Sequence, residues 1–172
     1  GMAGIFYLIL AMVGAGLTNG IQVQMSRRAG ESNYVGLART FTNGMMLCLG
    51  FGIGLMLLAM VLGPYIFRTT LDDVINAQLS IEFLNMRVWG LPFLMLTQLA
   101  NSFYIATGQA KYLVHGSIAG NAVNIVLDYG LIFGKLGLPE MGMVGAALAS
   151  VISEVVFGIT MYSIFYVKKM QV

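Results

Sequence analysis

Long uncharged stretches, separated by short clusters of charged residues, dominate this chain. No charged side chain occurs in residues 1–26, 40–67 or 88–110, and the apolar stretches 112–134 and 141–167 each contain one acidic residue. A helix needs about 20 apolar residues to cross the hydrocarbon core of a bilayer, and every stretch is long enough. The pattern therefore predicts five transmembrane helices, at about residues 4–26, 40–66, 87–109, 112–134 and 141–167.

The predicted fold is all-α, a polytopic membrane helical bundle. A transmembrane barrel strand would need alternating apolar and polar positions over about 10 residues, and the sequence has no such run. Glycine and proline mark the turns: Gly63-Pro64 is predicted to close the second span, and Gly137-Leu138-Pro139 to separate the last two. Pro92 falls near the start of the third span, where a helix tolerates proline best.

Composition excludes the main alternatives to a membrane protein. Of the 172 residues, 58% are hydrophobic and only 9% are charged, whereas a soluble domain carries about 25% charged residues. A disordered chain would combine low hydrophobicity with high charge. The formal net charge of +2 gives no reason to expect a nucleic-acid partner. Cys48 is the single cysteine, so the chain forms no internal disulfide.

The basic residues divide unequally between the two sides of the predicted bundle. One side carries six of them: Arg27, Arg28, Arg39, Lys111, Lys168 and Lys169. The other side carries three: Arg68, Arg87 and Lys135. The positive-inside rule places the richer side, with the C-terminus, in the cytoplasm and the protein in the cytoplasmic membrane. The first span then starts at the outer face with no leader, so we expect a further segment upstream.

Glycines recur at the spacing that brings small residues onto one helix face. Lipid gives no hydrophobic drive for helix association, so close backbone packing has to supply it. We therefore expect these positions to be helix–helix contacts. The pairs are Gly16 with Gly20, Gly50 with Gly54 and Gly116 with Gly120, and the series Gly145, Ala149 and Ser153 extends the pattern.

Asp128 lies inside the fourth predicted span, about six residues or roughly 9 Å from its outer end. A charged Asp at the centre of a membrane helix costs about 2.5–3.5 kcal/mol, so we expect a proton or a cation to neutralise it. Asn124 and Asn121 precede it on the same helix face. Carboxylate and amide oxygens suit a hard cation such as Na⁺. Hydrogen bonding to a neighbouring helix is the alternative.

Other polar residues inside the spans allow two interpretations. Glu154 lies near the middle of the fifth span, with Ser150 four residues earlier on the same face. It is either a second titrating site or, as we favour, a hydrogen-bonding group between helices. The first and third spans carry polar positions that are more often packing contacts than substrate contacts, but together they indicate a polar side of the bundle. These positions are Asn19, Gln22, Ser26, Gln98, Asn101 and Ser102.

The sequence offers no set of residues typical of an enzyme. It has no pair of carboxylates at a plausible catalytic spacing, and its one histidine, His115, lies near a span end. No base accompanies a serine nucleophile in sequence, and no phosphate-binding loop pattern occurs. We therefore expect a protein that is not an enzyme and that uses no cofactor.

Several segments resemble the multidrug and toxin extrusion (MATE) family, in order and over nearly the whole chain. They are Gln24–Glu31, which resembles the end of the family's second helix, Leu37–Asn43 (third), Arg87 with Gly90–Phe93 (fourth), Asn124–Asp128 with Ile132–Gly134 (fifth) and Met141–Ser150 (sixth). Proteins of this family have twelve helices in two lobes of six, and export organic cations and other drugs in exchange for Na⁺ or H⁺. The resemblance implies a partial N-terminal lobe, helices two to six, without helix one and the second lobe.

The resemblance also implies a cation site. In the family, an Asn and an Asp on helix five bind the cation, and these match Asn124 and Asp128. A Thr on helix six matches best at Ser150, which keeps the hydroxyl group. An Asp on helix one completes the family's site and has no counterpart here. The implied protein is a cation-coupled multidrug antiporter that confers drug resistance.

Two other functions are compatible with the sequence. A flippase for lipid-linked saccharides, or a polysaccharide exporter of the same superfamily, would have a more cationic central cavity, and no basic residue lies deep in a predicted span. A membrane scaffold that transports nothing would tolerate replacement of Asp128.

Overall fold

The chain forms a bundle of six helices within residues 2–70 and 74–167, which are the residues that this computed structural model describes. The helices are α1 (Met2–Gly30), α2 (Tyr34–Thr70), α3 (Val74–Arg87), α4 (Gly90–Ala106), α5 (Lys111–Phe133) and α6 (Gly142–Val167). The described ranges contain no strand, so the predicted all-α fold is confirmed. Lys168 and Lys169, which contribute to the predicted orientation, lie outside the described residues.

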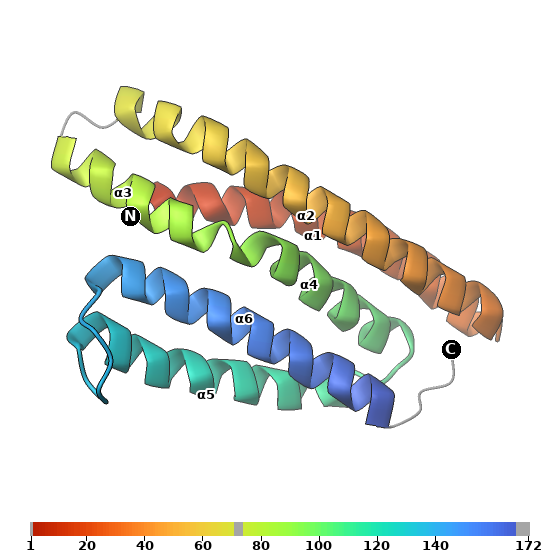
Figure 1. Cartoon of the computed structure of the whole chain (residues 1–172). Coiled ribbons are helices and arrows are strands. Elements are labelled where there is room, and N and C mark those ends of the chain that lie inside the picture. The colour runs from red at the N-terminus through yellow and green to blue at the C-terminus, as the bar shows by residue number, and fades with distance from the viewer. Residues whose placement is uncertain (1, 71–73, 168–172) are drawn as a thin grey trace.

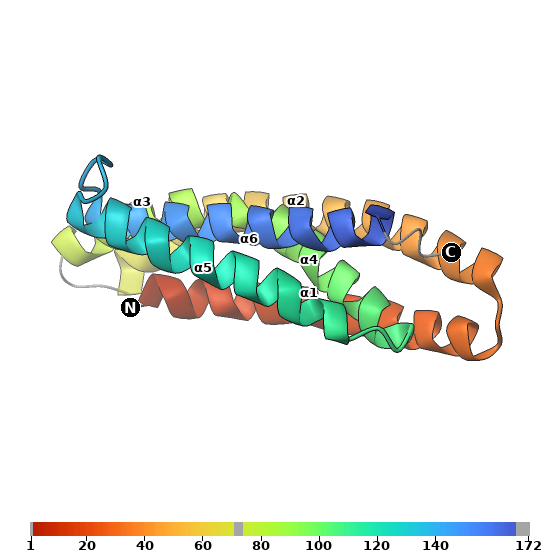
Figure 2. The ribbon, with the colours of Figure 1, turned by 90° about the horizontal axis from the view of Figure 1, so that it is seen from below.

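The helices run along one common direction, and the connections between them lie at the two ends of the bundle, except for the bend between α3 and α4, which lies midway (Figure 1). Seen from below, α1 lies along one side of the bundle and α6 along the other, and α5 crosses obliquely from the α1 side at its first turns to the α6 side at its last turns (Figure 2). Four helices, α1, α2, α5 and α6, are long and apolar enough to cross a membrane, and α3 with α4 makes a fifth span if the bent pair counts as one. The chain is part of a multi-pass membrane protein.

One helix and one helix end differ from the sequence prediction. Residues 74–87, which the charge pattern leaves outside the spans, form α3, and the chain then bends by 50° before α4 begins at Gly90. α2 continues through Gly63 and Pro64 to Thr70, so the prediction that this pair closes the helix is wrong. Gly63 packs closely on the side chain of Leu84 in α3. This contact stabilises α2 next to the proline, which would otherwise favour a helix break.

Two apolar clusters form the core. In one, the ring of Phe41 from α2 lies 5.0 Å from that of Phe103 in α4 and 5.6 Å from that of Phe165 in α6. In the other, the rings of Phe6 in α1 and Phe67 in α2 meet edge to face at 5.8 Å. Large apolar side chains also cover the outside of α1, α2 and α5, as expected for helices whose outer faces meet lipid; among them are Val23, Val61, Tyr65, Ile118 and Ile125.

The glycine pattern is confirmed for α5 and α6 only. Gly116 and Gly120 are buried against Met161 and Phe157 of α6, and Gly145 lies directly against the backbone of Leu131. By contrast, the two glycine pairs of α1 and α2 face away from every other described element. Spacing places residues on one face, but it does not say which face meets a neighbour. The four outward glycines are Gly16, Gly20, Gly50 and Gly54.

A glycine-to-alanine substitution should distinguish glycines that contact another helix from glycines that face outward. A Cβ at position 145 would lie 2.7 Å from the carbonyl oxygen of Leu131, so Gly145→Ala has to push α5 and α6 apart. We expect a loss of about 1–3 kcal/mol, seen as a lower melting temperature of the full-length protein in detergent. Gly54→Ala meets no atom within 4 Å and should be neutral or slightly stabilising. Equal effects of the two substitutions would contradict this packing.

Candidate functional site

Asp128 and Asn124 lie one turn apart on α5, and both side chains are partly buried. One carboxylate oxygen of Asp128, Oδ1, is shielded from solvent and accepts no hydrogen bond from the residues that the structure describes. A shielded anionic oxygen without a donor is costly unless a proton or a cation satisfies it. The arrangement therefore fits the predicted cation site, to which Asn124 can add an amide oxygen.

Ser150 lies on α6 at the level of this pair. The close contacts of Gly145 with Leu131 and of Gly120 with Ser153 fix the antiparallel register of α5 and α6. This register places Ser150 beside the α5 segment between Asn124 and Asp128. Its carbonyl oxygen accepts a hydrogen bond from Ser153 Oγ at 2.8 Å. Among the described residues, its hydroxyl group makes no hydrogen bond to Asp128 or Asn124.

A cavity of about 250 Å³ opens between α4, α5 and α6. It brings together four residues that the sequence singled out: Gln98, Asn101, Asn121 and Glu154. Two shielded oxygens of these residues, Asn101 Oδ1 and Glu154 Oε2, have no hydrogen-bond partner in the described ranges, and Glu154 Oε2 lies beside Gly90 at the start of α4. Thr97, Ser153, Gly120 and two apolar side chains, Leu94 and Phe157, complete the lining, which includes neither Asp128 nor Asn124.

The polar residues predicted on α1 do not reach this cavity. Asn19 is exposed on the outside of the bundle, and Gln22 is only partly buried. α1 instead contributes Thr18, whose hydroxyl group donates a hydrogen bond to Gln98 Oε1 at 3.2 Å. Sequence reasoning missed Thr18, because a threonine hydroxyl group in a membrane helix usually bonds its own backbone, as it also does here toward Ala15.

Glu154 forms an ion pair with Arg87 at the bend between α3 and α4. Arg87 Nη2 donates to Glu154 Oε1 at 2.6 Å, and the two side chains are only 14% and 15% exposed. Tyr7 of α1 completes the cluster: its ring lies 4.0 Å from the guanidinium carbon of Arg87, and its hydroxyl group donates to Glu154 Oε1 at 3.4 Å. Glu154 thus makes the contact between helices that we favoured.

The interior position of Arg87 corrects the sequence interpretation, which placed this residue at a span edge. Gly90 has no side chain and so leaves room for the carboxylate of Glu154 and for Arg87 Nη1 at the start of α4. The sequence contains a signal for this ion pair. An acid deep in one span implies a base in another, and Arg87 directly precedes an uncharged stretch.

Comparison with known proteins identifies the family. The sequence model of the MatE family matches residues 1–130, about three quarters of the chain. The chain belongs to the MATE family. The probable multidrug resistance protein NorM of Synechocystis is 29% identical over 153 residues, which cover 88% of this chain and 32% of that protein. The multidrug resistance protein NorM of Burkholderia vietnamiensis is 27% identical over 157 residues, 89% of this chain and 33% of that protein.

Solved structures of MATE transporters share the fold. An inward-facing multidrug resistance MATE transporter of the MOP superfamily superimposes with a TM-score of 0.85 at 24% identity, over 97% of this chain and 37% of the transporter. A MATE protein in a bent conformation gives the same TM-score and identity, over 97% and 36% of the two chains. The chain spans about a third of the length of the relatives it matches, so the predicted assignment to part of a MATE transporter is confirmed.

The ion pair of this MATE chain can be tested by removing its partners singly and together. Arg87→Gln or Glu154→Gln leaves a buried charge without a partner, so each should cost about 3–5 kcal/mol. The double variant should cost clearly less than the sum, because neither charge remains. The measurement is the melting temperature of the full-length protein in detergent.

The exposed pair of Arg27 and Glu31, whose side chains are 81% and 51% exposed, provides the control. Arg27→Gln should leave the melting temperature nearly unchanged, because solvent screens that pair. If the effects of Arg87→Gln and Glu154→Gln simply add in the double variant, the two charges do not stabilise each other and the pair is wrongly assigned.

Proposed function

We propose that this chain is part of a secondary transporter that exports organic cations and amphipathic drugs across the cytoplasmic membrane in exchange for Na⁺ or H⁺. Membership of the MATE family supports a transporter rather than an enzyme. The observation that carries the ion coupling is the shielded, unpartnered oxygen of Asp128 beside Asn124. A group in this state gains free energy from a proton or from Na⁺, and ion coupling requires such a group.

In the proposed cycle, Asp128 binds the coupling ion and the drug alternately. Loading with Na⁺ or H⁺ neutralises the carboxylate and removes the attraction for a cationic drug. The ion can shift the conformation only by its different affinity for the two states. We expect that difference to act on the bend between α3 and α4 and on the packing of α5 and α6, because these elements surround the polar residues.

The cavity between α4, α5 and α6 is the proposed drug contact. The amide groups of Gln98, Asn101 and Asn121 in its lining suit a ligand that carries N–H donors. Arg87 balances the charge of Glu154, so Asp128 is the acidic side chain in the described interior that no base neutralises. A cationic ligand would therefore be drawn toward Asp128. Helix one and the second lobe of the family's architecture are proposed partners that complete the binding site.

The same ion pair bears on the two alternative functions. A flippase for lipid-linked saccharides, or a polysaccharide exporter, should present basic groups to an anionic substrate, but Arg87 already binds Glu154. Its guanidinium group therefore adds no net positive charge to the interior. A scaffold that transports nothing would have no use for a shielded carboxylate on α5, and it predicts that Asp128 can be replaced without loss.

Asp128→Asn provides the decisive test, because it keeps the shape of the side chain but removes the charge and the proton. We expect the full-length protein to lose at least about tenfold in ion-driven export, which corresponds to about 1.4 kcal/mol or more of coupling. The measurement is efflux of a fluorescent organic cation from proteoliposomes under an imposed Na⁺ or H⁺ gradient.

Glu140→Gln is the matched control, since Glu140 is an exposed acid between α5 and α6 and should not affect export. Undiminished coupled export by Asp128→Asn would rule out the proposed role of Asp128 and favour the scaffold. Export that stays ion-independent in the unmodified protein would rule out the antiporter itself.

A further inference from the structure

One end of the bundle carries an excess of positive charge. At the end where α1 meets α2 and α4 meets α5, the described chain places four basic side chains and one acidic one: Arg27, Arg28, Arg39, Lys111 and Glu31. At the other end, the described residues Arg68 and Lys135 are balanced by Glu82 and Glu140. Figure 1 shows these two ends, with the α1–α2 connection at the right.

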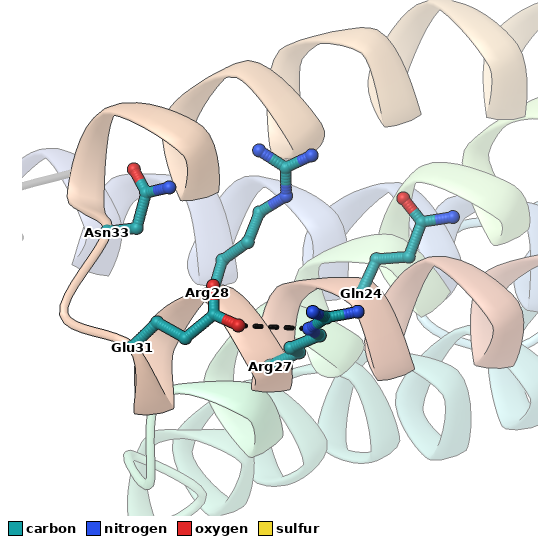
Figure 3. A pocket seen from close by; sticks show the side chains of 5 residues that line it. All are labelled: Gln24, Arg27, Arg28, Glu31 and Asn33. Atoms are coloured by element: carbon teal, nitrogen blue, oxygen red, sulfur yellow. Dashed lines mark hydrogen bonds and ion pairs between the residues drawn. The ribbon is translucent and has the colours of Figure 1, made fainter.

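Two adjoining cavities lie at the basic end, and both are lined by Gln24 and Arg28. The outer one, of about 500 Å³, also contacts Arg27, Glu31 and Asn33. Figure 3 shows the side chain of Arg28 extending from α1 toward the first turns of α2. Beside it, Arg27 Nε forms an ion pair with Glu31 Oε1 at 2.9 Å. Arg28 is thus the guanidinium group that the two cavities share.

Arg28 has no acidic partner in the described part of the chain, although its side chain is partly buried. Its guanidinium group reaches the backbone of α2 at Gly36, where a Cβ would lie 2.5 Å from Nη1. Arg39 lines the inner cavity and likewise forms no ion pair among the described residues. Two cations that face one cavity without a counter-ion favour an anion there.

The inner cavity, of about 210 Å³, changes from polar to apolar along the helix axes. On α2 its lining passes from Arg39 and Asn43 to Leu47, and on α1 from Arg28 to Ile21. At 1.5 Å per residue, each passage covers roughly 10–12 Å. A free anion would need only the polar end, whereas a phospholipid carries its phosphate and its acyl chains in this order and along this direction. Leu47 is 53% exposed, so the apolar end opens onto the outer face of the bundle.

We propose that the groove between the end of α1 and the start of α2 binds the phosphate group of an anionic phospholipid. Arg28 and Arg39 hold the phosphate by charge-assisted hydrogen bonds, for which the planar guanidinium group is well suited. The amide groups of Gln24 and Asn43 add neutral donors around it. One acyl chain lies along Ile21 and Leu47. This inference depends on the membrane fold and does not depend on the proposed transport activity.

The test compares lipid binding to the full-length protein after delipidation in detergent. Native mass spectrometry would follow the titration with phosphatidylglycerol and, separately, with phosphatidylcholine. We expect phosphatidylglycerol to bind at least about tenfold more tightly, because the extra charge of the zwitterionic lipid opposes the arginines. Equal affinities of the two lipids would overturn the proposal, and this comparison requires no variant.

Variants test whether the preference for phosphatidylglycerol arises in the groove between α1 and α2. The double variant Arg28→Gln/Arg39→Gln should lose the preference for phosphatidylglycerol, whereas Arg28→Lys/Arg39→Lys should keep part of it, because the charge remains but the bidentate geometry does not. Arg68→Gln removes an arginine from the opposite end and should keep the full preference. An unchanged preference in the double glutamine variant, or an equal loss in Arg68→Gln, would overturn the assignment.

A competition experiment separates a lipid from a free anion. Inorganic phosphate at millimolar concentration should not displace phosphatidylglycerol, because it cannot occupy the apolar end of the groove. Displacement by inorganic phosphate at concentrations comparable to the lipid would show a soluble-anion site and overturn the lipid assignment.

Discussion

The ion pair of Arg87 and Glu154 is the interaction on which the arrangement of this bundle depends. It lies at the bend between α3 and α4. It connects this bend to α6 and, through Tyr7, to α1. Backbone hydrogen bonds from Val88 to Leu84 and from Leu91 to Val88 continue through the bend, and the ion pair fixes the end of α3 against α6. The same pair leaves the described interior with one acid, Asp128, that no base balances.

The sequence predicted the helices well because hydrocarbon imposes one simple rule, that charged side chains stay out. Each of the five predicted stretches coincides with one helix, namely α1, α2, α4, α5 or α6, with ends displaced by up to six residues. The sequence did not predict α3, because its polar side chains lower its mean hydropathy. Its apolar residues Ala77, Ile81 and Leu84 nevertheless recur at helical spacing and are buried. The end of α2 was mispredicted at Pro64 for another reason. Proline stops helices in water more reliably than in a packed membrane bundle.

The candidate site could be predicted only as far as one helix determines it. Asn124 and Asp128 share a face because helical geometry requires it, and a single sequence reveals this. Which face meets which neighbour depends on the rotation of each helix. Hence the sequence grouped Asn19 with the polar side of the bundle, whereas in the structure Asn19 is exposed and Thr18 is the α1 residue that bonds Gln98. The separation of Asp128 from the cavity at Glu154 likewise follows from the register of α5 against α6.

The close approach of α5 and α6 has a mechanical consequence. Backbone contact at Gly145 and burial of Gly116 and Gly120 join the two helices along their length, whereas α5 meets α4 only sparsely. α6 in turn packs on α3 and α4 and carries the ion pair with Arg87, so among the described helices α5 is attached to the bundle almost entirely through α6. The cavity between α5 and α4 is lined by amides and hydroxyl groups, which water can hydrate. A tilt of α5 on α6 would therefore widen or narrow the polar cavity while α6 keeps its contacts with α3 and α4.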